Sequence, residues 1–520
     1  MKAGYSRFLA LLLTTAALLT FLPHPVSKAS GTDAQPVQAR NLTDSVQVTD
    51  SVGFSDTAVF FDGSDDEALS STGDLASLTL ESTEGMGSLY ILFETEYGTY
   101  TVTDNTSGKT ITCGESLFVH EFIDVESAFG TAPTSLTLNF DHGSVRIAEI
   151  VVYSSGQVPA SVQRWSQPVD GRTDLVLFTT HGDDEHLFFA GILPYYAVEM
   201  GFRVQVVYLT DHWNNHPERI HEMLNGLWAV GIRTYPVLGS FPDIYATTRE
   251  TCYDRLRGRG YTKDDLTEWA VEQIRRFRPL VTVGHDFYGE YGHGQHMVYA
   301  DVLAAALSVS SDPEKYPESA ANYGTWEVPK AYFHLYGQNR IYLDWDTPME
   351  NFDGMTPFQV SKQLGFGAHV SQHNNFNWWI KPYDTAASIP SFSPCVYGLY
   401  HSTVGEDVAK NDFFENLTTY TELDRIAAEE EAARLAEEQR KEEERLAAEE
   451  EARRREEEAQ RLAAEEEARR REEARLRAEQ EAAIAREAAR RRNLLVSLCA
   501  SAALVIGIPL LILSRRRPKE

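Results

Sequence analysis

Residues 175–191, LVLFTTHGDDEHLFFAG, constrain the fold of this chain more than any other segment. Four apolar residues lead into a polar loop with one histidine and three consecutive acids, after which the chain becomes apolar again. This order is typical of a buried parallel strand that ends in a loop and feeds a helix. Ligands bind just beyond the carboxyl ends of such strands. We therefore expect His181, Asp183 and Asp184 at a functional site; the alternative is a run of acids that only begins a helix.

A second strand-and-loop segment, residues 279–296, has the sequence PLVTVGHDFYGEYGHGQH. Zinc in proteins prefers imidazole nitrogen and carboxylate oxygen, and a catalytic site leaves one position for water. His181 and Asp184 from the first loop, together with His296 from the second, supply such a three-ligand set. One histidine alone would be an ordinary surface or core residue. Three histidines in one loop, paired with an H-x-x-D loop, predict a metal site.

The two loops resemble motifs of the PIG-L, or LmbE-like, zinc-dependent N-acetylglucosaminyl de-N-acetylase family. Residues 181–185, HGDDE, resemble the A-H-P-D-D-E signature, and residues 292–296, GHGQH, resemble the later H-P-D-H segment. Residues 219–222, RIHE, resemble the R-x-x-E helix between them. Two departures loosen the loops: Gly182 replaces a proline, and Gly-Gln at 294–295 replaces Pro-Asp. The resemblance covers roughly residues 173–417.

The resemblance implies a zinc hydrolase that removes N-acetyl groups from amino sugars or glycans. The implied metal ligands are His181, Asp184 and His296. Asp183 would be the general base that takes a proton from water and returns it to the leaving amine. His293 would stabilise the oxyanion, and Arg219 would hold substrate hydroxyls.

Several polar residues near these motifs have roles that the sequence leaves open. Glu185 is expected to begin a helix and support the loop. Asp286 and Glu290 are expected either to hydrogen-bond the histidines or to be structural. His369 either enters the mouth of the site or belongs to the core, and Cys252 either pairs with Cys395 or stays free.

Strands and helices alternate across residues 172–417, which predicts a Rossmann-like, mostly parallel α/β sheet. Further strands are expected at 204–209 and 280–283, and helices at 218–230 and 266–277. No G-x-G-x-x-G sequence follows the first strand, so a dinucleotide cofactor is not indicated.

Residues 31–160 contain short alternating segments separated by turn-forming residues, which predict a β-sandwich. The ending SVRIAEIVVY resembles the last strands of galactose-binding-like domains. A carbohydrate-binding role and a purely structural role both remain open for this domain. A net charge of -30 leaves no basic footprint for nucleic acid.

The two ends of the chain predict attachment to a membrane. Residues 1–29 have the pattern of a secretory signal, with a retained anchor as the alternative. Residues 423–492, rich in Glu, Ala and Arg, are expected to form a helical stalk, either a single helix or a coiled coil. Residues 493–514 are expected to span the membrane, and 515–520 to form a cytoplasmic tail.

These features together predict a single-pass membrane protein whose sandwich and catalytic domains are extracellular. Two alternatives to a glycan deacetylase remain at this point. One is a cell-surface adhesin with a degenerate hydrolase domain, against which the intact histidine and aspartate set argues. The other is a zinc amidase that acts on a non-glycan amide.

Overall fold

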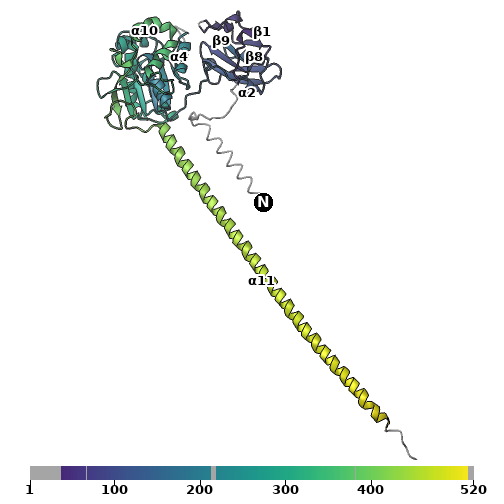
Figure 1. Ribbon diagram of the computed structural model, residues 1–520. Helices are drawn as coiled ribbons and strands as arrows, with labels where there is room; N and C mark the ends of the chain where they lie inside the picture. Colours follow the sequence, from purple (N-terminus) through teal and green to yellow (C-terminus); the bar gives the residue numbers. More distant parts are fainter. Residues whose placement is uncertain (1–36, 66, 212–217, 381, 513–520) are drawn as a thin grey trace, which may run out of the picture. The chain divides into compact units, whose positions relative to one another are not determined.

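A computed structural model describes residues 37–512 apart from 66, 212–217 and 381, without the side chains of 377–380 and 502–512. The chain divides into two units, residues 1–423 and 424–520 (Figure 1). The expected signal at 1–29 and tail at 515–520 lie outside the described residues.

Residues 47–153 form two antiparallel sheets around a common apolar core. The five-stranded sheet has the order β1 (Gln47–Val52), β3 (Ala76–Glu81), β8 (Ser135–Phe140), β5 (Tyr100–Asp104) and β6 (Thr110–Cys113). The four-stranded sheet has the order β2 (Leu69–Ser70), β9 (Arg146–Tyr153), β4 (Ser88–Phe93) and β7 (His120–Asp124), and α2 (Val125–Phe129) follows β7. In β3, every second side chain is buried, because successive residues of a strand face opposite sides of the sheet. The likeness to galactose-binding-like domains stays a prediction.

The following α/β region contains a seven-stranded sheet. Its order is β12 (Val237–Phe241), β11 (Val204–Thr210), β10 (Leu175–Thr179), β13 (Val281–Gly284), β14 (Lys330–His334), β16 (Val396–Ser402) and β15 (Arg340–Tyr342). The first five strands are parallel, and the last two pair antiparallel. The chain moves outward from β10 through β11 to β12 and then returns to the other side of β10 with β13. The order therefore reverses between β10 and β13, and such a switch point is where open α/β sheets bind ligands.

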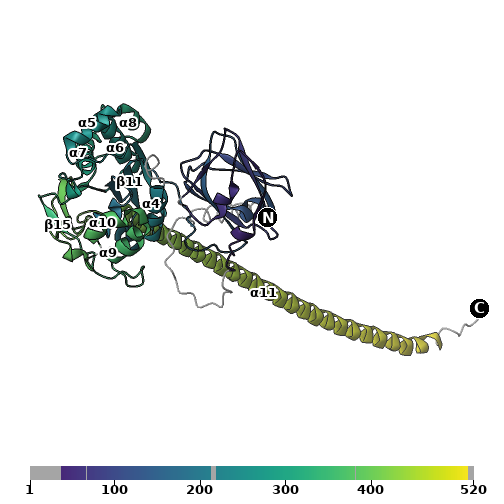
Figure 2. The same cartoon turned by 90° about the horizontal axis from the view of Figure 1, so that it is seen from above.

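Helices cover both faces of this sheet. Alternate residues of β10 belong to separate cores: Leu175 and Leu177 to one, Val176 and Phe178 to the other. The second core contains α5 (Arg249–Gly258), α6 (Lys263–Phe277) and α7 (Gly294–Val309), which lie together in Figure 2. The first core contains α3 (Asp184–Leu187), η3 (Leu193–Glu199), α4 (Glu218–Ala229) and α9 (Pro357–Val360). Burial on both faces explains why β10 is a continuous apolar run.

The remaining helical segments lie mainly in the last third of the α/β region. They are η4 (Glu290–Gly292), α8 (Pro317–Tyr323), η5 (Ser361–Gly365), η6 (Phe366–Ala368), η7 (Val370–Gln372), α10 (His373–Ile380) and η8 (Ala386–Ser388). The mixed α/β fold expected from the sequence is thus present, with strands and helices close to their expected positions. Helix α6 begins three residues earlier than expected, because Thr262 and Asp265 form a capping box around its polar first turn.

Buried contacts at the start of β7 join the two-sheet domain to the α/β region. The Nε2 atom of His120 lies 2.7 Å from Nδ1 of His221 on α4, and both rings are buried. The backbone N–H of Val119 donates to the hydroxyl of Tyr235 at 3.1 Å. These contacts fix the helix that carries Arg219.

Helix α11 runs from Tyr420 to Ile512, 93 residues without a break. It starts three residues before the expected stalk and continues past its expected end at 492. Ion pairs between Glu and Arg three or four residues apart line it; Arg434, for example, contacts both Glu431 and Glu438. Whether α11 is a single helix or a coiled coil stays a prediction.

Within the part of the chain whose side chains are described, no helix has the length and apolar content needed to cross a membrane. The span expected at 493–514 extends beyond those residues and stays a prediction. All four cysteines are free. Cys252 and Cys395 belong to the two different cores of the α/β region, so the pairing considered from the sequence is not present.

Candidate metal centre

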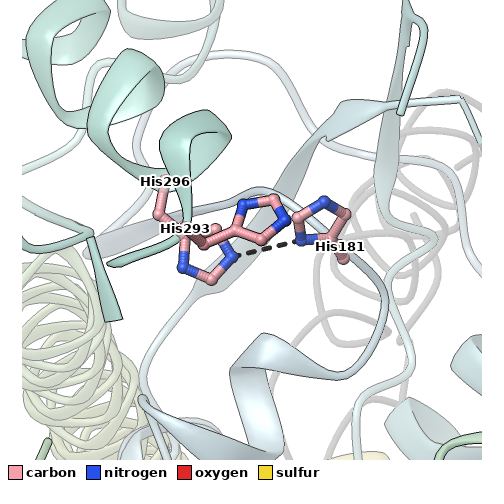
Figure 3. Close-up of side chains that lie close together, drawn as sticks. All are labelled: His181, His293 and His296. Atoms are coloured by element: carbon pink, nitrogen blue, oxygen red, sulfur yellow. Dashed lines mark hydrogen bonds between the residues drawn. The ribbon is translucent and has the colours of Figure 1, made fainter. Parts of the chain in front are cut away.

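The residues expected at the functional site come together at the switch point between β10 and β13. His181 and Asp184 follow β10, with Asp184 the first residue of α3. His293 and His296 lie at the start of α7, which follows the loop after β13. In Figure 3, the rings of His293 and His296 face His181, so loops more than a hundred residues apart meet in space.

The side chains of the expected ligand set converge. The Nδ1 atom of His181 lies 3.2 Å from a carboxylate oxygen of Asp184 and 3.2 Å from Nε2 of His296. The other oxygen of Asp184 lies 3.4 Å from the same Nε2 atom. Tetrahedral zinc with ligands at about 2.0–2.2 Å places neighbouring ligand atoms about 3.3–3.6 Å apart. With one carboxylate oxygen of Asp184 close to each imidazole, the spacing of His181, Asp184 and His296 is near that of a zinc site.

Carboxylates surround the ring of His181. Its Nε2 atom faces a carboxylate oxygen of Asp243 at 3.4 Å, which leaves Nδ1 directed at the ligand triangle. Burial alone would lower the pKa of His181, but Asp243 and Asp184 outweigh it and raise the pKa to about 10. An imidazole that holds a proton this strongly marks a site with a negative potential, which favours a bound cation.

Glu290 is the central carboxylate beneath the site. One of its oxygens accepts hydrogen bonds from Nδ1 of His285 and Nδ1 of His296, at 2.8 and 2.7 Å. The other accepts from Nδ1 of His334 at 2.7 Å and from the backbone N–H of Asp286 at 3.1 Å. Burial would raise the pKa of Glu290, but these imidazoles hold it well below its ordinary value. With Nδ1–H of His296 bound to Glu290, Nε2 is the lone-pair nitrogen left for a metal.

Neighbouring charges also shift the pKa values of the other two expected ligands. Burial lowers the pKa of His296, but Asp184 and Glu290 raise it overall to about 9. Burial raises the pKa of Asp184, but His296 and His181 bring it well below its ordinary value. Asp184 is therefore ionised, as a metal ligand must be.

His293 has a different environment from the three expected ligands. It is the N-cap of α7, and its Nδ1 atom accepts a hydrogen bond from the backbone N–H of Gln295 at 3.3 Å. Burial, with help from His296 and His181, lowers its pKa to about 2, so the ring is neutral and its proton sits on Nε2. A ring with this tautomer is a hydrogen-bond donor, although its position near His181 and His296 also makes it a possible alternative ligand.

Asp183 is paired with Arg219, which the resemblance assigns to substrate. An amino nitrogen of Arg219 lies 3.0 Å from a carboxylate oxygen of Asp183. The side chain of Asp183 makes no capping hydrogen bond to α3, so the helix-capping alternative does not describe it. Burial raises the pKa of Asp183, and Arg219 opposes that rise. An acid with a raised pKa is a suitable general base.

The departure from Pro-Asp in the second motif has a structural explanation. The backbone N–H of Gly294 donates to the carbonyl of Ala246 at 2.6 Å, a bond that proline cannot make. The amide of Gln295 accepts from the N–H of Ile244 at 2.7 Å and donates to the carbonyl of Pro242 at 2.9 Å. These bonds hold the backbone on both sides of Asp243, the residue that backs His181.

Sequence reasoning missed several residues of this centre. Asp243 and His334 contact its histidines from other parts of the chain, and no local motif signals either one. Tyr291 lies beside the rings of His293 and His296, with a left-handed backbone (φ 46°). His369 does not line the mouth: it is fully buried beside His186.

Curated proteins similar to this chain are deacetylases. A 1D-myo-inositol 2-acetamido-2-deoxy-alpha-D-glucopyranoside deacetylase of Saccharopolyspora erythraea is 27% identical over 210 residues, which is 36% of this chain and 72% of that protein. A deacetylase with the same substrate name, from Frankia casuarinae, is 30% identical over 122 residues, which is 22% of this chain and 37% of that protein. No family model matches the chain.

Among solved structures, an N,N'-diacetylchitobiose deacetylase from Pyrococcus horikoshii aligns with 44% of this chain and 82% of its own, at 12% identity and a TM-score of 0.27. The sequence identity to the curated relatives is higher than the identity to this structure. In its three motifs and in these relatives, the chain is similar to deacetylases of the LmbE-like, or PIG-L, type.

Proposed function

We propose that the α/β region is a zinc-dependent hydrolase that removes the acetyl group from an N-acetylated amino sugar or glycan. The observation that carries the proposal is the convergence of His181, Asp184 and His296, whose donor atoms lie 3.2 to 3.4 Å apart. The names of the curated relatives support the substrate class, since their substrates carry an acetamido sugar.

The residues around the triangle supply the remaining chemistry. A bound zinc ion would polarise an amide carbonyl and lower the pKa of water towards about 7. Asp183 accepts a proton from the attacking water and returns it to the amine nitrogen as the carbon–nitrogen bond breaks. The products are acetate and a free amine.

Two further side chains act on charge and position. The neutral ring of His293 donates from Nε2 to the oxyanion that forms on the acetyl oxygen. Arg219 holds the carboxylate of Asp183 in place. By its resemblance to the family helix, Arg219 also contacts a substrate hydroxyl.

Metal analysis and acetate-release kinetics on matched variants test these roles. His181→Ala, Asp184→Ala and His296→Ala should each lose the metal of this site together with activity. Asp183→Asn keeps the shape of the side chain but not its basicity, so the metal should remain while kcat falls about 10²–10⁴-fold. His293→Ala should also keep the metal and lower kcat, by about 10²–10³-fold.

Two results would contradict the assignment. Loss of the metal in His293→Ala, with retention in His181→Ala, would make His293 a ligand in place of His181. Full activity of His296→Ala would remove the proposed metal hydrolysis altogether. A substrate panel of N-acetylated sugars and simple N-acetyl amides separates a glycan deacetylase from an amidase that acts on other compounds.

We also propose that the protein is held at the outer face of a membrane by residues 493–514. The support is the signal-like segment at 1–29 and the apolar run bounded by arginines at 490–492 and 515–517. The full chain should sediment with membranes, and external protease should release the α/β region from intact cells. Protection of that region from external protease would contradict the proposal.

A further inference from the structure

We propose that Glu185, His186 and His369 form a second site for a divalent metal ion of the zinc type, separate from the first. Carboxylate oxygen and imidazole nitrogen are zinc's preferred ligands. These three residues provide one such oxygen and two such nitrogens in the interior of the α/β region, where each can offer a donor atom within 4.8 Å of the others.

The distances between the donor atoms suit a shared ion. One carboxylate oxygen of Glu185 lies 3.3 Å from Nε2 of His186 and 3.8 Å from Nε2 of His369. The shorter distance equals the edge expected for tetrahedral zinc, about 3.3–3.6 Å, and the longer one exceeds it slightly.

All three side chains of this cluster lie in the interior of the α/β region. Glu185, His186 and His369 are all 0% exposed. Neither nitrogen of His186 makes a hydrogen bond within the usual limits among the described residues. The phenol of Tyr208 interacts with the carboxyl group of Glu185, but it leaves the imidazole of His186 unsatisfied. Buried polar atoms without partners usually mark an ion or a water molecule.

Two glycines place these rings against the backbone. A Cβ atom on Gly226 of α4 would lie 2.9 Å from Nε2 of His186 and 3.0 Å from Nε2 of His369. The same point lies 3.0 Å from the carbonyl oxygen of Gly365. Two imidazole nitrogens and a backbone oxygen thus face one small space on the surface of α4. The carbonyl of Gly365 is a candidate for the fourth ligand.

The site would connect segments that are far apart in the sequence. Glu185 and His186 belong to α3, directly after the ligand Asp184. His369 lies between η6 and η7, close to 180 residues later. An ion here would fix α3, and with it the loop that carries Asp183 and Asp184. Its ligands are separate from those of the first site, so the two sites can be tested independently.

Metal content measured on the purified full-length protein tests the proposal. After saturation with zinc and removal of free metal, the unaltered protein should hold two ions per chain. His296→Ala should retain one, His369→Phe should retain one, and the double variant should hold none. His373→Phe is the matched control: its ring also packs on Phe366 but is no part of the cluster, so two ions should remain.

His369→Phe could lose metal simply because it misfolds, so a second measurement uses His296→Ala, which leaves the residues of the second site unchanged. X-ray absorption on His296→Ala, loaded with zinc alone, should show two imidazoles and oxygen ligands around the remaining ion. A folded His296→Ala protein without metal overturns the proposal, as does a single ion in the unaltered protein that His369→Phe does not remove. If His296→Ala keeps every ion of the unaltered protein while His369→Phe loses one, the second site stands and the first fails.

Discussion

Asp184 and Glu185 are neighbours in the chain, yet they belong to two buried clusters with different surroundings. Around Asp184, the imidazoles of His181 and His296 each face a further carboxylate, from Asp243 or Glu290. Around Glu185, the imidazole of His186 contacts the Glu185 carboxylate at 3.3 Å and, among the described residues, makes no well-aligned hydrogen bond. In the first cluster, Asp243 and Glu290 orient the imidazole rings. In the second cluster no such carboxylate orients His186, so the proposed metal ion would have to fix its ring.

Helix geometry explains how consecutive acids reach separate clusters. Both residues lie in the first turn of α3, where successive side chains point about 100° apart. One acid therefore joins the residues of α7, and the next joins residues packed between α3 and α4. A carboxylate that orients a ligand imidazole typically changes metal affinity or activity 10–100-fold, so the two clusters should respond differently to mutation.

Among single substitutions that distinguish the two clusters, Glu290→Gln should cause the largest loss of zinc affinity or activity. It removes the negative charge to which three imidazoles are hydrogen-bonded. We expect a loss of metal affinity or activity near the upper end of the range, about 100-fold. Zinc affinity and kcat/KM are the measurements. Glu314→Gln, the same change at an exposed position, is the control. An unchanged zinc affinity would mean that the first cluster needs no support from Glu290.

Asp243→Asn should have a smaller effect on the same cluster, about 10-fold in metal affinity. Its carboxylate makes a single contact with His181 at 3.4 Å, and 40% of its side chain is exposed. Gln295→Ala frees the backbone on both sides of Asp243 and should reproduce part of this loss. If Gln295→Ala weakens zinc binding more than Asp243→Asn does, then positioning Asp243 is not the main contribution of Gln295 to the site.

Gly226→Ala perturbs the second cluster alone. Alanine stabilises a helix interior by about 1 kcal/mol relative to glycine, so Tm should rise if the space beside α4 is unimportant. Because the added methyl group would lie 2.9 Å from Nε2 of His186, we instead expect Tm to fall and one ion to be lost. Gly258→Ala at the end of α5, where a methyl group meets nothing within 4 Å, is the control. A raised Tm with unchanged metal content would contradict this expectation.

Arg219 variants should give the smallest change, a shift in the pH profile. Arg219 lowers the pKa of Asp183, so Arg219→Met should raise that pKa. Since Asp183 acts as a base only when ionised, the acidic limb of kcat/KM should move to higher pH, while Arg219→Lys should keep it nearer its original place. A higher KM with no shift of the limb would assign Arg219 to substrate alone.

Local sequence pattern was sufficient for much of the α/β region. The apolar runs before His181 and His285 are β10 and β13, and the helix that carries Arg219 spans nearly the expected residues. The closeness of His181, Asp184 and His296 was also predictable, because both loops follow parallel strands and parallel strands end at the same edge of a sheet. Helix starts were less predictable, since α6 begins at a capping box outside the apolar pattern.

The sequence by itself determined the three motifs, their order and the donor atoms that they offer, because strand periodicity and ligand chemistry are local properties. Only the tertiary structure decided which carboxylates contact the far nitrogen of each of those imidazoles. Asp243 backs His181, and Glu290 joins His285, His296 and His334. It also brought His369 to Glu185 and His186. These partners come from segments far apart in the chain, and only the packing of the sheet and helices sets the distances between them.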